Sequence, residues 1–165
     1  MCVLSKYPLY SPIRIQHSQY LDGGGYASLL VSSTIEGHRF HFTSTRLTAW
    51  DSAENIFSHE QLRITINALP MDEPLILGGD FNTKYPQTSN NGPSSPYTDF
   101  LTRSSLHNVV DGIGWNSSSI DHIFARGPLV FSGRRSTDTR PSDHNYVFAE
   151  VDYSQAIDLP GGRRS

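Results

Sequence analysis

The stretch LILGGDFNT, residues 75–83, constrains the fold more than any other part of this sequence. An apolar run ends at two glycines, and Asp80 and Asn82 follow with Phe81 between them. Residues two apart in an extended chain point to the same face. The pattern therefore predicts a central strand over 74–78 whose end presents a carboxylate and a carboxamide together. It also fits a plain strand-ending turn, because Asp and Asn readily hydrogen-bond to turn backbone.

Hydrophobic patterning predicts strands with few helices in the rest of the chain. The predicted strands, in chain order, are 2–4, 26–32, 38–45, 74–78, 119–125 and 145–151. Glu36-Gly37 predicts a hairpin turn between the second and third of these. In the third, Phe40 and Phe42 share one face and His41 the other, and we expect His38, His41 and His59 on solvated faces.

One segment, 52–69, has the signals of a well-formed helix. Asp51 or Ser52 can cap it, Pro70 ends it, and an inward stripe consists of Ile56, Leu62, Ile66 and Leu69. A shorter helix is predicted over 97–106, after a polar loop at 83–96 that is a candidate substrate-facing loop. This irregular order of strands and helices predicts an α+β fold with mixed sheets and outer helices rather than a regular alternation.

The 165 residues are enough for one domain, predicted over 1–153, with a disordered tail over 154–165. The net charge of −3 excludes a global basic field, so contact with nucleic acid would rest on local cations or a metal ion. The single cysteine, Cys2, excludes an internal disulfide framework. No apolar run reaches the length of a membrane span and no signal peptide is visible, which slightly favours an intracellular location.

Three predicted strand ends carry carboxylates. They lie in GDFN at 79–82, SIDHIF at 119–124 and SDH at 142–144. Each alone also fits a turn or a single ion pair. Together they would bring like charges to one rim, which a divalent cation offsets. Carboxylates, a carboxamide and one histidine suit hard-metal phosphoester chemistry better than zinc.

GDFN, SIDHIF and SDH, in this order, resemble the endonuclease/exonuclease/phosphatase superfamily. Three weaker pieces agree with the same family: VLSKYPL at 3–9, FTSTRLTAW at 42–50 and EQLR at 60–63. The resemblance implies a deoxyribonuclease-I-like fold, a four-layer α/β sandwich of two mixed β-sheets flanked by helices. It also implies a Mg²⁺- or Mn²⁺-dependent hydrolase of phosphoesters, of phosphodiesterase or nuclease type, with nucleic acid as one potential substrate. The oligomeric state is not readable from the sequence.

The resemblance also implies roles for individual residues. Asp80 accepts a proton from the attacking water and helps bind the metal, and Asn82 orients that water and the phosphate. Asp121 hydrogen-bonds His144, which donates to a phosphate oxygen, and Asp143 is a metal ligand. A carboxylate partner favours the protonated, charged histidine. These assignments give a catalytic set of Asp80, Asn82, Asp121 and His144, and a metal set of Asp143 and Asp80.

Two departures from the family pattern keep alternatives open. The family's strand and helix upstream of 3–9, with its metal-binding glutamate, have no counterpart here, so we expect an N-terminally incomplete fold. Arg46 stands where the family has a histidine, and we expect it to bind a phosphate oxygen, although a surface cation is equally compatible. The alternatives are a phosphatase of small or lipid phosphoesters and an inactive remnant that at most binds.

Overall fold

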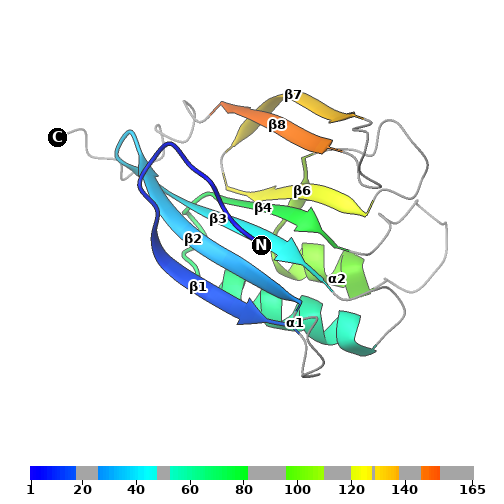
Figure 1. Cartoon of the computed structure of the whole chain (residues 1–165). Coiled ribbons are helices and arrows are strands. Elements are labelled where there is room, and N and C mark those ends of the chain that lie inside the picture. The colour runs from blue at the N-terminus through cyan, green and yellow to red at the C-terminus, as the bar shows by residue number, and fades with distance from the viewer. Residues whose placement is uncertain are drawn as a thin grey trace.

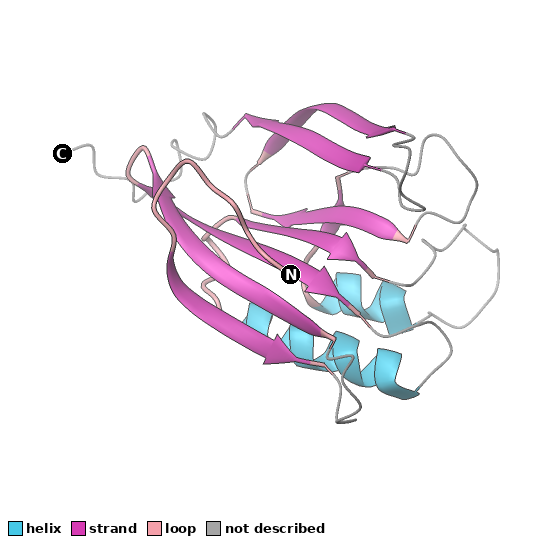
Figure 2. Cartoon of the chain, viewed as in Figure 1, coloured by secondary structure: helices cyan, strands magenta, loops and turns pink. Residues whose placement is uncertain are grey.

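The computed structural model of the protein describes residues 1–17, 26–47, 53–81, 96–109, 120–127, 129–137 and 146–152. The strands in these residues are β1 (Tyr10–Gln16), β2 (Ala27–Ile35), β3 (His38–Arg46), β4 (Leu75–Asp80), β5 (His107–Asn108), β6 (Asp121–Arg126), β7 (Val130–Thr137) and β8 (Tyr146–Asp152). The helices are α1 (Ala53–Asn67) and α2 (Pro96–Arg103). Figure 2 shows that strands dominate the described part of the chain.

The strands form two sheets. The larger has six strands in the order β1-β2-β3-β4-β6-β5, and the smaller is the pair β7-β8. β3 and β4 run parallel, whereas the other described pairs are antiparallel. In Figure 1 both helices lie on one side of the six-stranded sheet and β7-β8 on the other. The expectation of an α+β fold with two packed sheets and outer helices is therefore confirmed, and the larger sheet is mixed as predicted.

Side chains alternate between the two faces of the large sheet, so each face has its own apolar core. Towards the helices, buried side chains of the sheet join those of α1 and α2; the cluster includes Leu62, Ile66, Leu75, Leu77, Phe100 and Phe124. Towards β7-β8, Phe40 and Ala125 form a second cluster with Ile76, Phe131 and Val147 against it. Both faces of the central strands are thus covered, which explains why 75–77 is a continuous apolar run.

The hairpin turn and the helix predicted from local sequence signals are both present in the structure. Glu36 and Gly37 both have positive φ, 51° and 85°, and connect β2 to β3 in a tight hairpin. In α1, Leu62 and Ile66 are fully buried, and Leu69, two residues beyond the end of the helix, is partly buried against the same cluster, as the predicted stripe requires. The cap at Asp51 or Ser52 and the side chain of Ile56 lie outside the described residues. Neither described helix is long and apolar enough to cross a membrane.

The strand predicted over 2–4 is wrong. These residues have no regular structure, and Leu4 is 91% exposed. The edge position beside β2 is taken instead by β1, whose pairing has a register shift between Tyr10 and Ile13, where Ser11 has a φ of 52°. Pro12 lies at this irregularity, a position that proline tolerates because it is on a sheet edge.

The solvated faces expected for two histidines are also wrong. His41 is 1% exposed and His59 is 3% exposed, whereas His38 is half-buried. His41 alternates with Phe40 and Phe42 as predicted, but its face of the sheet lies under the helices rather than in water. The ring of His41 is hydrogen-bonded on both sides, to Ser32 Oγ at 3.0 Å and to Glu73 Oε2 at 2.5 Å. Burial is therefore compatible with its polarity.

Candidate active site

Arg46, Asp80 and Asp121 form a row across the end of the large sheet. The parallel pairing of β3 with β4 sets Arg46 beside Asp80, and the antiparallel pairing of β4 with β6 sets Asp80 beside Asp121. In Figure 1 the arrowheads of β3 and β4 point to the same end of the sheet, and β6 begins there. Two strand ends and one strand start thus bring a cation and two carboxylates together.

All three members of the row lie on the face of the sheet that β7-β8 covers further along. Asp80 lies four residues after Ile76 in β4, and Asp121 lies four residues before Ala125 in β6, so each shares a face with that apolar residue. Ile76 and Ala125 both belong to the cluster on the face towards β7-β8. Arg46 is an even number of residues from Phe40 and Phe42 in β3, so it lies on the same face as these two side chains. Registered neighbours on one face have Cβ atoms about 5 Å apart, so the two carboxylates repel each other unless a cation lies near them.

Arg46 is the cation that the described residues provide at this edge. Its Nε lies 3.8 Å from Asp80 Oδ2, and its side chain is 62% exposed whereas that of Asp80 is 14% exposed. The guanidinium also lies over the ring of Tyr26, with 5.6 Å between its central carbon and the ring centroid. Because it reaches solvent, Arg46 can exchange a carboxylate for another anion at little desolvation cost.

Gly79 and Phe81 fix the chain at the end of β4 and directly after it. Gly79 has a φ of +145°, and a Cβ there would lie 2.0 Å from the carbonyl oxygen of Thr45, so a side chain cannot fit. A Cβ on Gly78 would meet only ordinary contacts, so of the two glycines Gly79 is the one at which the backbone approaches closely. Phe81 is fully buried and contacts the ring of Phe124 edge-on at 5.0 Å between centroids, so it anchors the chain directly after β4.

Backbone hydrogen bonds hold the strand ends on both sides of Asp80. The Leu47 N–H donates to the Asp80 carbonyl at 2.9 Å, and the Phe81 N–H donates to the Ile120 carbonyl at 2.8 Å. These bonds tie β3, β4 and the start of β6 together at the row. Next to Asp121, His122 is 2% exposed and lies on the opposite, helix-covered face beside Phe81 and Phe124, in keeping with strand alternation.

Three residues of the predicted site lie outside the described residues, namely Asn82, Asp143 and His144. The structure therefore brings together Asp80, Asp121 and Arg46 from the predicted set. One neighbour in this arrangement was not singled out from the sequence, namely Tyr26. It lies two residues before Ser28, which pairs with Thr45 near the end of β3, so its place beside Arg46 becomes visible only once the β2-β3 pairing is known.

The carboxylates in the row fit a hard divalent cation. Among the described residues, no group of three or more His, Cys, Asp and Glu side chains is placed to hold a metal. Mg²⁺, however, is often held by only one or two carboxylates, with water and substrate phosphates completing its coordination. Asp80 supplies one such carboxylate, and the carboxylate of Asp121 at the adjacent position adds negative charge near the ion. Oxygen ligands suit Mg²⁺ and Mn²⁺.

Comparison with known proteins identifies the family to which this chain belongs. The model of the endonuclease/exonuclease/phosphatase family matches residues 1–144, so the chain belongs to that family. The family consists of phosphoester hydrolases that generally depend on a divalent metal. A comparison with curated proteins gives no match.

Three solved structures illustrate proteins with a similar fold. The chain has a TM-score of 0.65 and 17% identity to a mannosyl-6-phosphatase of Bacteroides thetaiotaomicron, covering 88% of this chain and 67% of that one. The human Nocturnin catalytic domain gives 0.65 and 16%, covering 88% and 60%. A humanized TDP2 from D. rerio gives 0.60 and 15%, covering 87% and 65%. The chain thus spans about two thirds or less of these proteins, and the likeness shows a shared deoxyribonuclease-I-like fold.

Proposed function

We propose that this protein hydrolyses phosphodiesters in a metal-dependent reaction of nuclease type, at the edge marked by Arg46, Asp80 and Asp121. The observation that carries the proposal is the registered row itself. It sets two carboxylates and an exposed guanidinium side by side at the end of one sheet. A phosphodiester is an anion, so attack on it requires both a base for water and positive charge near the phosphate.

Each residue has a distinct task in this proposal. Asp80 accepts the proton of the attacking water, which Asn82 orients towards phosphorus. Arg46 releases the Asp80 carboxylate and donates to a non-bridging phosphate oxygen. His144 donates to a phosphate oxygen as negative charge builds up, and Asp121 holds the ring of His144 in its protonated form. Asp143 and Asp80 would hold Mg²⁺ or Mn²⁺, which when bound neutralises phosphate charge.

The test is hydrolysis of plasmid DNA and bis(p-nitrophenyl) phosphate in the presence of Mg²⁺, with EDTA as the metal-free condition. Asp80→Asn keeps the size of the side chain but removes the base, and we expect it to lower the rate at least ~100-fold. The matched control is Asp72→Asn, which changes an exposed carboxylate in the turn before β4 and should leave the rate unchanged.

Two results would contradict the proposal. Full activity of the Asp80 variant would make GDFN a structural turn. No turnover of any phosphoester with Mg²⁺ or Mn²⁺ would leave the inactive binding protein as the better description. A monoester, p-nitrophenyl phosphate, separates the phosphatase alternative, because a phosphatase would cleave it faster than the diester.

A further inference from the structure

The guanidinium of Arg46 lies between an aromatic ring and a carboxylate. Its central carbon is 5.6 Å from the centroid of the Tyr26 ring, and its Nε is 3.8 Å from Asp80 Oδ2. The arginine side chain is nevertheless 62% exposed, and Tyr26 is half-buried. A long exposed side chain normally samples many rotamers, and ordering it costs conformational entropy. A ring on one side and an anion on the other reduce that freedom.

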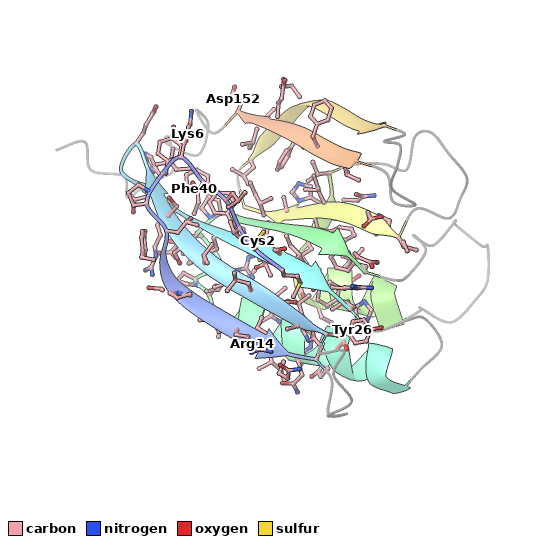
Figure 3. The ribbon with its side chains drawn as sticks, in the orientation of Figure 1. Cys2, Lys6, Arg14, Tyr26, Phe40 and Asp152 are labelled. Carbon is pink, nitrogen blue, oxygen red and sulfur yellow. The ribbon has the colours of Figure 1, made fainter. Side chains whose placement is uncertain are left out.

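The backbone of Tyr26 is fixed relative to the sheet. Its carbonyl accepts a hydrogen bond from the His17 N–H at 3.0 Å and one from Gln16 Nε2 at 3.3 Å. Figure 3 labels Tyr26 at the end of the sheet where β2 begins, the same end at which β3 and β4 finish. The ring therefore extends from an anchored position rather than from a free loop.

The strand that carries Arg46 is fixed as firmly. On one side of it, Thr45 Oγ1 lies 2.5 Å from Ser28 Oγ, and that hydroxyl lies 2.5 Å from His17 Nε2. Thr45, Ser28 and His17 are all buried. On the other side, the Leu47 N–H is bonded to Asp80 as described above. The backbone positions that carry Tyr26 and Arg46 are thus held relative to each other by buried contacts of their neighbours.

We propose that Tyr26 is a positioning residue for phosphate binding. Its ring holds the Arg46 guanidinium at the carboxylate row through a cation–π contact, so that Arg46 can exchange the Asp80 carboxylate for a phosphate oxygen with little loss of rotamer freedom. The proposal rests on the proposed function in one respect, since it takes Arg46 as the phosphate-binding group. The chemistry it concerns is any phosphate anion at this edge.

The test is a double-mutant cycle on the binding of inorganic phosphate, measured by isothermal titration calorimetry. The four proteins compared are the unmodified protein, the Tyr26→Leu variant, the Arg46→Gln variant and the double variant. A cation–π contact at an exposed site predicts that Tyr26→Leu weakens phosphate binding about 2- to 5-fold. In the Arg46→Gln background the same change should have no further effect. Tyr26→Phe keeps the ring and should bind phosphate as the unmodified protein does.

Three results would overturn the positioning role. These are an equal loss for Tyr26→Leu with and without Arg46, an equal loss for Tyr26→Phe and Tyr26→Leu, and no phosphate binding by the unmodified protein. Thermal melting of each variant separates a loss of binding from a loss of folded protein, and Tyr26→Phe remains informative if Tyr26→Leu unfolds.

Turnover measured in parallel distinguishes this inference from the proposed function. If the cycle shows coupling but no phosphoester is cleaved, the hydrolase proposal fails and the positioning role stands. If phosphodiesters are cleaved but the cycle is additive, the positioning role alone fails.

Discussion

The two faces of the large sheet differ in their polar side chains at the same strand ends: those on the helix-covered face are buried, whereas those on the other face form the candidate site. On the helix-covered face, Thr45 and His122 are buried, and Thr45 is tied to other polar groups. One residue along each of these strands, Arg46 and Asp121 lie on the other face, and the side chain of Arg46 is mostly exposed. Because side chains alternate along a strand, a buried residue that supports the fold and a residue of the candidate site can be direct neighbours in sequence. The two kinds of group can be tested separately by mutation.

The sharpest form of this comparison is the adjacent pair Asp80 and Phe81. Phe81→Ala should lower the free energy of unfolding by about 3–5 kcal/mol, because it empties a fully buried site against Phe124. Asp80→Asn keeps the size of its side chain and should cost less than about 1 kcal/mol. Urea unfolding of both variants measures the difference. An Asp80 variant that unfolds as early as the Phe81 variant would show that the two faces are not separable.

The buried face should also be sensitive at Glu73, which accepts a hydrogen bond from the ring of buried His41. Glu73→Ala leaves a buried ring nitrogen without its acceptor, and we expect a loss of about 1–3 kcal/mol. Asp72→Ala, in the same turn but exposed, should change stability by less than about 0.5 kcal/mol. If thermal melting showed an equal loss of stability for Glu73→Ala and Asp72→Ala, the hydrogen bond between Glu73 and His41 would contribute nothing to stability.

The smallest predicted effect is a dependence of stability on pH through His17. Burial, and secondarily the charge of nearby His59, lower the pKa of His17 from 6.5 to about 4. The unfolded chain therefore binds a proton that the folded chain resists between these values, so stability falls as the pH drops from 6.5 towards 4. Between pH 6.5 and 5.5 this amounts to about 1 kcal/mol.

The measurement is chemical unfolding across this pH range, for the unmodified protein and for His17→Gln. The variant should lose about 1 kcal/mol less over the interval, because it has no imidazole at this position to protonate. Parallel pH profiles for the two proteins would mean that His17 is not the group responsible.

Sequence reasoning predicted the elements that depend on local signals. The Glu36-Gly37 turn, the stripe of α1 and the apolar run of β4 each specify their structure within a few residues, and each is present. The row at the site was predicted in part for the same reason, since GDFN marks the end of a strand. What a local pattern cannot give is the register that sets Arg46 and Asp121 on either side of Asp80.

The elements that were missed lack such local signals. β1 contains Pro12 and is exposed at most positions, so its sequence resembles a loop, and its strand conformation depends on pairing with β2. β7 contains the charged pair Arg134-Arg135, which gives no apolar alternation, and it pairs with β8 with a register shift between Ser132 and Arg135. The buried ring of His41 is bonded to Ser32 in β2 and to Glu73 in the turn before β4, and no pattern within β3 predicts these distant partners.

The pairing of Asp80 with Asp121 has a consequence for how the molecule folds. The β2-β3 hairpin joins neighbours in sequence, but the two carboxylates meet only when the chain between them, 81–120, closes into a loop. Closing long loops slows folding, because their entropy is lost before the contacts that repay it have formed. We therefore expect the hairpin to form early and the edge that carries the site to be completed late. A nascent chain would then contain an ordered β2-β3 hairpin before Asp80 and Asp121 lie side by side.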